Sequence, residues 1–121
     1  MTEKENSKRH DLEDRTLEFA KRVRKFVAGL KNTLANTEDS KQLIRSSGSI
    51  GANYIEANET LSKKDFLMRI KICRKEAKES RYWLRLVDTD IKNEHEKQRE
   101  ALESEARELT HIFGSIVTKS K

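Results

Sequence analysis

The chain has 121 residues, of which 39% are charged and 34% hydrophobic, and it contains no proline and only four glycines. A chain of this length fits one compact domain and leaves little room for a second. High charge without proline is typical of long helices, and it argues against sheets, barrels and proline-rich linkers. We therefore predict one domain over residues 1–121, in which residues 1–10 form a flexible N-terminal extension.

Cysteine content and hydropathy limit where the protein acts. Cys73 is the single cysteine, which excludes an intrachain disulfide and a multi-cysteine metal site. The N-terminal residues are charged and lack the apolar run of a signal peptide. The longest uncharged stretches have ten residues, whereas a membrane helix needs roughly 20. We expect a soluble, cytoplasmic protein that has no contact with a membrane.

Four segments have the apolar periodicity of amphipathic helices. The first covers about residues 11–30, and Thr37, Ser62 and Asn93 are suited to begin the other three. Short connections between them predict an all-α, antiparallel, up-down-up-down four-helix bundle.

The third segment has two stripes. The first repeats in steps of four and three, which indicates a face packed against other helices: Phe66, Ile70, Cys73, Ala77, Ser80, Leu84, Val87 and Ile91. We interpret Cys73 on this face as an inert core thiol. The flanking stripe is Ile72, Glu76, Glu79 and Trp83. Either Trp83 covers the edge of the core, or the stripe contacts another subunit, where tryptophan is enriched; we favour the second interpretation.

The second segment carries no charge between Arg45 and Glu56 and is rich in small residues. Two interior glycines cost roughly 1 kcal/mol each relative to alanine, so other helices should approach closely on more than one side. We predict the most buried helix of an assembly, with one face open to contacts: Arg45, Ser49, Ala52 and Glu56. A buried carboxylate needs a partner, so we expect Glu56, within that assembly, to pair with an arginine of the third segment: Arg69, Arg74 or Arg81.

The net charge of +5 is concentrated in two clusters of lysine and arginine. Lys71, Lys75, Lys78 and Arg85 share the side of the third segment opposite Cys73, and Lys21, Arg22 and Lys25 cluster in the first segment. Such clusters can neutralise phosphates and release counterions. In a lone monomer they can also be a solvated face, and this alternative stays open. Since the sequence has no RNA-binding module signature, any nucleic-acid contact should be made to the backbone.

Catalytic motifs are weak. The histidines are far apart and form no readable triad with serine, cysteine or aspartate. One Glu-x-x-His occurs, Glu108 to His111, but a di-iron bundle needs two such motifs and two further glutamates. The SSGSIG run lacks the spacing and the preceding strand of a phosphate loop. We expect no enzyme activity, no metal and no cofactor.

Residues 45–88 resemble the bacterial four-helix bundle family, also called the 23S ribosomal RNA intervening-sequence protein family. The specific parts are Ser49, Ile50, Ala52, Asn53, Glu56 and Ala57, and the run KEAKESRYWL at Lys75 to Leu84. The resemblance implies a homopentameric ring and no enzyme activity. Members are encoded within ribosomal RNA intervening sequences, and a related branch serves diversity-generating retroelements, where a basic ring is thought to engage nucleic acid and a reverse transcriptase. Many members have glycine where this chain has Asn58, so the turn after the second helix is expected to differ.

Together, these observations predict a non-catalytic, basic homo-oligomer, most simply a pentamer, that binds nucleic acid, with RNA as the expected ligand. The alternative is a structural or protein-interaction scaffold without a nucleic-acid role. Partners would be further copies of the chain, RNA, or a nucleic-acid-handling protein. The residues assigned to structure or assembly are Arg45, Ser49, Ala52, Asn53, Glu56, Glu76, Arg81 and Trp83.

Overall fold

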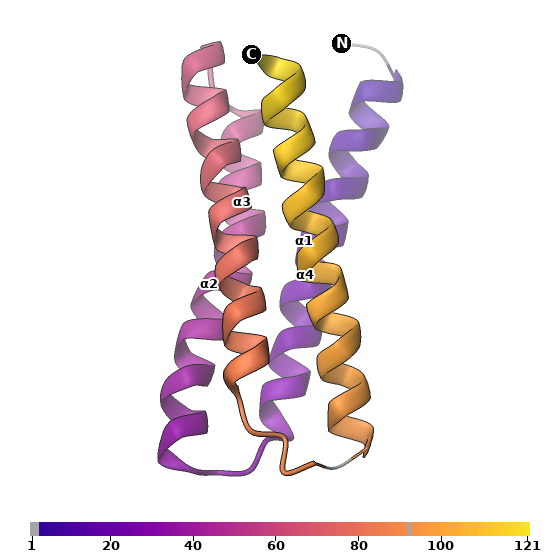
Figure 1. The fold of residues 1–121 in the computed structure, drawn as a ribbon. Coiled ribbons are helices and arrows are strands. Elements are labelled where there is room, and N and C mark those ends of the chain that lie inside the picture. Colours follow the sequence, from indigo (N-terminus) through magenta and orange to yellow (C-terminus); the bar gives the residue numbers. More distant parts are fainter. Residues whose placement is uncertain (1–2, 92) are drawn as a thin grey trace.

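The computed structural model describes residues 3–91 and 93–121, which form four helices. They are α1 (Glu3–Ala28), α2 (Leu34–Asn58), α3 (Lys63–Leu86) and α4 (Asn93–Ser120). Consecutive helices run antiparallel and are joined by short connections (Figure 1). The predicted all-α four-helix bundle is confirmed. Within the described ranges, no helix has an apolar stretch that could span a lipid bilayer.

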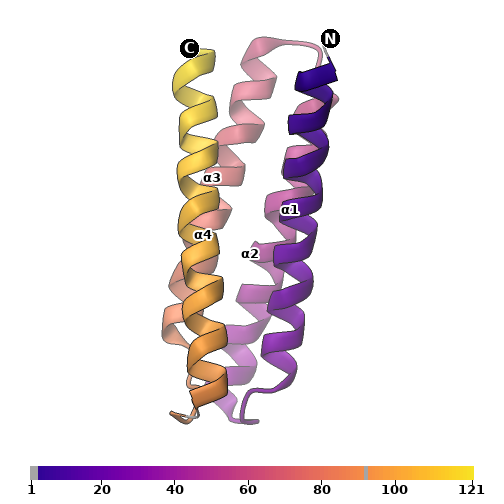
Figure 2. The same cartoon turned by 90° about the vertical axis from the view of Figure 1, so that its right-hand side faces the viewer.

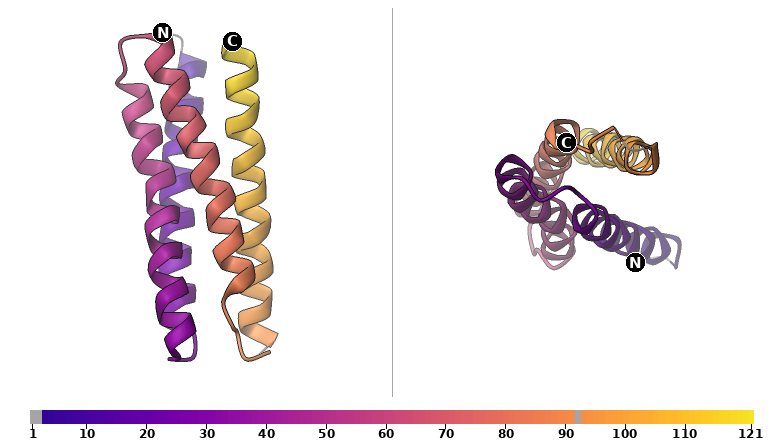
Figure 3. Two further views of the ribbon diagram at one scale, coloured as in Figure 1. Left: turned by 60° about the vertical axis from the view of Figure 1, so that its left-hand side comes forward. Right: turned by 90° about the horizontal axis from the view of Figure 1, so that it is seen from below.

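The helices surround the core in chain order. α2 packs between α1 and α3, and α4 packs on α3, so α1 and α3 lie on opposite sides of the core. α1 and α4 make the smallest interface. They diverge toward the end of the bundle that holds both termini (Figures 2 and 3). The bundle is therefore most open between its first and last helices.

Of the four helix starts, two differ from the sequence prediction, and α4 begins at Asn93 as predicted. α1 begins at Glu3 rather than near residue 11, so residues 3–10 continue the helix; residues 1–2 of the predicted extension lie outside the described part. The cap of α2 is Thr33, not Thr37, because Thr33 has extended backbone angles and its hydroxyl oxygen accepts from the Asn36 N–H at 3.1 Å. Ser62 caps α3 as predicted.

The core face of α3 follows the predicted seam from Ile70 to Val87, where every seam residue is at most 1% exposed. Ile91 is an exception and is 87% exposed, because α3 ends at Leu86 and the chain turns before reaching it. Cys73 is buried, its thiol donates to the Ile50 carbonyl at 3.4 Å, and burial raises its pKa to about 12. The thiol is thus held in the core in its neutral form.

Small residues let α2 approach its two neighbours. Toward α3, the hydroxyl oxygens of Ser46 and Ser80 lie 2.8 Å apart and both residues are fully buried. Toward α1, a Cβ atom on Gly51 would lie only 2.9 Å from Oγ1 of Thr16. The predicted close approach on more than one side therefore occurs within a single chain.

Candidate nucleic-acid interface

The predicted cations of α3 form one exposed stripe along its outer face. Lys71, Lys75, Lys78 and Arg85 are all exposed, as expected for positions opposite the buried seam. Tyr82 belongs to the same stripe, because the steps from Lys71 through Lys75, Lys78 and Tyr82 to Arg85 are four, three, four and three. Its side chain is 57% exposed. Tyr82 could have been predicted from this spacing, but the predicted site residues were chosen by their charge alone.

Part of this stripe forms one wall of a groove of 710 Å³ between α3 and α4. Lys78 and Arg85 of the predicted set lie in the groove, and Lys71 and Lys75 continue the stripe beside a shallower hollow on α3. The α3 side is lined by Arg74, Lys78, Arg81, Tyr82 and Arg85; the α4 side is lined by Arg107, Thr110, His111, Gly114, Ser115 and Thr118.

The groove has a strong excess of positive charge. Five of its lining residues are lysine or arginine, and no aspartate or glutamate is among the described residues that line it. Glu103 of α4 is the carboxylate that reaches these cations, with its Oε1 3.3 Å from Nε of Arg81 and 3.7 Å from Nε of Arg85. No ion pair is formed within the described part of the chain by the other three: Arg74, Lys78 and Arg107. An anion in the groove would meet these three charges uncompensated.

The contribution of α4 residues to this groove was not predicted from the sequence. Arg107 and His111 are four residues apart and therefore share a face of α4. Only the packing of α4 on α3 shows that this face borders the cations of α3. Arg81, which was assigned to structure or assembly, also lines the groove and pairs with Glu103.

The second predicted cluster lies elsewhere. Lys21, Arg22 and Lys25 are exposed on α1, which contacts α2 and α4 but not α3. Arg22 and Lys25 border a small hollow of 230 Å³ against α4. The cations of α1 and the stripe of α3 therefore lie on two helices that do not contact each other, and each borders α4.

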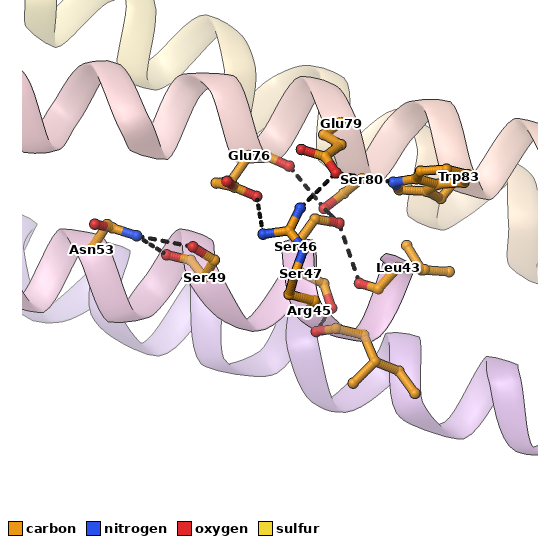
Figure 4. A network of polar contacts seen from close by, with 11 residues as sticks. Leu43, Arg45, Ser46, Ser47, Ser49, Asn53, Glu76, Glu79, Ser80 and Trp83 are labelled. Atoms are coloured by element: carbon orange, nitrogen blue, oxygen red, sulfur yellow. Dashed lines mark hydrogen bonds and ion pairs between the residues drawn. The ribbon is translucent and has the colours of Figure 1, made fainter. Parts of the chain in front are cut away.

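Several residues assigned to structure or assembly form a polar network between α2 and α3 (Figure 4). The Arg45 guanidinium lies between two carboxylates, 3.3 Å from Oε2 of Glu76 and 2.5 Å from Oε1 of Glu79. The indole N–H of Trp83 donates to the same oxygen of Glu79 at 3.2 Å. Glu76 is only 5% exposed, so Arg45 neutralises a carboxylate that would be costly to bury alone.

The charge state of Glu79 follows from this geometry. Partial burial raises the pKa of Glu79, but the hydrogen bonds from Arg45 and Trp83 outweigh burial and leave the pKa below its ordinary value. Trp83 also packs against the core cluster. In the single chain, Trp83 therefore covers the edge of the core; a contact of the same stripe with another subunit stays a prediction.

The expected pairing of Glu56 with Arg69, Arg74 or Arg81 is not present within the chain. Glu56 is exposed and makes no ion pair with any residue of the described ranges. Arg74 and Arg81 point to the α4 side of α3, away from α2. Arg69 faces α2 but donates to the Asn53 amide oxygen at 3.0 Å. The prediction overlooked this amide as a partner for arginine.

The other residues of the family-like motif on α2 also bond locally. The Asn53 amide nitrogen donates to the carbonyl and hydroxyl oxygens of Ser49, each at 2.9 Å. Ala52 is exposed and Ser49 is half-buried. Together with half-buried Ile72, these residues give uncharged side chains to the edge between α2 and α3.

The Glu-x-x-His motif does not converge on a shared site. Glu108 accepts from Arg15 of α1 at 2.8 Å, whereas His111 lines the groove on the α3 side of α4. Among the described residues, no group of three or more potential metal ligands comes together.

A four-helix bundle with a cationic groove and no catalytic constellation among its described residues places the chain among small all-α bundle proteins. More specifically, it belongs to the 23S rRNA-intervening sequence protein family, whose model matches residues 8–115. A solved structure from Bacteroides thetaiotaomicron, a protein of unknown function from the S23 ribosomal protein family, is 35% identical to it. That match covers 87% of this chain and 96% of the other, with a TM-score of 0.73. Comparison with curated proteins finds no match.

Proposed function

We propose that the protein is a non-catalytic RNA-binding bundle that holds phosphates in the groove between α3 and α4. The observation that carries this proposal is the presence of five lysine and arginine residues in one groove, where Glu103 is the one carboxylate among the described residues that forms ion pairs with them. The family name, which refers to an intervening sequence of 23S rRNA, supports RNA as the ligand.

Binding would be driven by phosphate contacts. Lysine and arginine side chains that replace the counterions of a nucleic acid gain free energy from counterion release, and they do so without reading the bases. Arg74, Lys78 and Arg107 form no ion pair with the described residues, so no such pair has to rearrange before the three side chains bind phosphate. Affinity should therefore depend steeply on salt and weakly on sequence.

Assembly would multiply these contacts. We further propose the homo-oligomeric ring, with five subunits as the family resemblance implies. The edge between α2 and α3 is suited to this contact, because Ala52, Met68 and Ile72 bring uncharged surface to it. A ring repeats the groove once per subunit, and linked sites raise the overall affinity without any new kind of contact.

The test is a salt titration of binding to two unrelated single-stranded RNAs. In the groove variant, Arg74, Lys78 and Arg107 are all changed to glutamine; because the three side chains are exposed, the fold should be retained. We expect weaker binding to both RNAs. The slope of log affinity against log salt should become shallower by about 2 for each groove engaged, since each lost phosphate contact on a single strand contributes about 0.7.

The matched control removes the same charge elsewhere, by changing Lys31, Lys63 and Lys97 to glutamine. These lysines are exposed and lie outside the groove. An unchanged salt slope in the groove variant, or an equal change in the control, would contradict the groove as the binding surface. If the wild type binds neither RNA at low salt, the scaffold alternative replaces the proposal.

A further inference from the structure

We propose that Tyr82 stacks on an unpaired base, so that the groove selects single-stranded RNA over duplex. This inference rests on the proposed function and adds the class of RNA to it. It starts from an aromatic side chain that is placed within a row of cations and is not needed for the core.

The position of Tyr82 is the first argument. It lines the groove and is 57% exposed. Its ring meets Trp83 edge-on, with centroids 5.0 Å apart and planes at 76°. Trp83 is partly buried against the core cluster, whereas Tyr82 does not take part in that packing. An edge contact together with this exposure leaves ring surface of Tyr82 open to a ligand.

The spacing of the neighbouring cations is the second argument. On a helix that rises 1.5 Å per residue, Lys78 precedes Tyr82 by about 6 Å and Arg85 follows it by about 4.5 Å along the axis. A nucleotide with its base on Tyr82 can therefore place the phosphates on its two sides near cations. The groove volume of 710 Å³ lies within the range of sites that enclose organic ligands.

Only an unpaired base can use this arrangement. In a duplex, the bases are paired and stacked on one another, and the protein meets phosphates and groove edges instead. Single-strand binders combine a cationic groove with aromatic side chains in just this way, and such stacking tolerates any sequence because every base has a π-face. The same groove would then hold duplex RNA by phosphate contacts alone.

The experiment compares Tyr82→Leu with the matched variant Tyr82→Phe, which retains the ring. Affinity is measured for a single-stranded RNA of 20 nucleotides and for the duplex of the same sequence. We expect Tyr82→Leu to weaken single-strand binding about 5- to 10-fold, at the lower end of the measured effects of stacking residues. Duplex affinity and the salt slope should stay unchanged, and Tyr82→Phe should bind like the wild type.

A second readout uses the wild type alone. Trp83 is the single tryptophan and lies beside Tyr82, so single-stranded RNA should quench its fluorescence more than duplex does at equal occupancy. Equal quenching, wild-type single-strand affinity in Tyr82→Leu, or an equal loss of duplex affinity would each overturn the role of Tyr82. In these cases the salt-dependent binding would still stand. Failure of the wild type to bind either RNA at low salt would overturn both proposals.

Discussion

Thr16 lies against Gly51 at the interface of α1 and α2, where a Cβ atom on the glycine would be 2.9 Å from Oγ1 and 3.3 Å from Cβ of the threonine. Thr16 cannot easily move aside. It is 1% exposed, and its hydroxyl donates to the carbonyl oxygens of Leu12 and Glu13. The missing side chain of Gly51 thus sets the distance between the two helices.

We expect Gly51→Ala to lower the free energy of unfolding by about 1–3 kcal/mol, the usual cost of overpacking a core. Gly48 is the matched control, because the nearest atom to its added Cβ would be Nη2 of Arg24, at an ordinary 3.5 Å. Gly48→Ala should therefore stabilise the helix by up to about 1 kcal/mol. Urea denaturation of the two variants at one protein concentration measures the difference. If the two variants had similar unfolding free energies, α1 would be able to move away from the added methyl group at residue 51.

Arg15 and Glu105 join α1 to α4 by two hydrogen bonds, from Nε at 2.7 Å and from Nη2 at 2.8 Å. These bonds outweigh partial burial and hold the pKa of Glu105 below its ordinary value. The ionised carboxylate is thus favoured in the folded state. Its contribution to stability is complete above the unfolded pKa of about 4.3 and is lost as the pH falls through the lower folded pKa.

Glu105→Gln should consequently cost about 1 kcal/mol at pH 7, the size expected for a partly exposed pair. The difference in unfolding free energy between wild type and variant should shrink as the pH falls from 5 to 3. Denaturant titrations at several pH values test this expectation. A difference that is constant over this range would mean that the ion pair does not stabilise the fold.

The sequence predicts the faces of the helices better than it predicts where the helices begin and end. Heptad spacing predicts the α3 seam because it depends on local geometry alone. The prediction is wrong for Ile91, which is exposed, because heptad spacing does not show where a helix ends. Thr33 and Thr37 are both acceptable caps by residue type, and only the backbone angles at Thr33 decide between them.

The candidate site is harder to predict because it depends on two helices. The α3 stripe can be recognised from the spacing of Lys71, Lys75 and Lys78. The groove forms only where α4, with Arg107, packs beside that stripe. The relative position of the two helices depends on tertiary packing and cannot be predicted from the spacing within one helix. The arginines of α3 illustrate the same point, because the faces on which they lie decide their partners and none of them reaches Glu56 within one chain. A pairing of Glu56 with an arginine of another subunit stays a prediction.

Glu103 and Glu56 differ in how far each carboxylate is held by arginine within the chain. The Glu103 side chain is 20% exposed and contacts both Arg81 and Arg85, whereas Glu56 is exposed. We expect Glu103→Gln to cost about 1 kcal/mol in unfolding free energy and Glu56→Gln to stay within about 0.5 kcal/mol. Thermal or urea unfolding compares the two. A larger loss for Glu56→Gln would place that carboxylate against an arginine of a neighbouring subunit.

The proposed ring makes a separate prediction at Ala52. Within the chain this side chain is exposed, so a larger residue meets no internal neighbour and the bundle should still fold. At a subunit contact, an arginine would bury a charge and hold the two surfaces apart, which costs several kcal/mol. Ala52→Arg should therefore block assembly while leaving the helical content intact.

Light scattering coupled to gel filtration, with circular dichroism for the fold, tests this prediction. The wild type should have a mass several times that of the 14.1 kDa chain, and Ala52→Arg should approach the mass of one chain. Ser104→Arg is the matched control, since Ser104 is an exposed small residue on α4 outside the groove and its replacement adds the same charge. A 14.1 kDa wild type at micromolar concentration would refute the ring. Assembly of Ala52→Arg like the wild type would instead move the subunit contact away from the edge between α2 and α3.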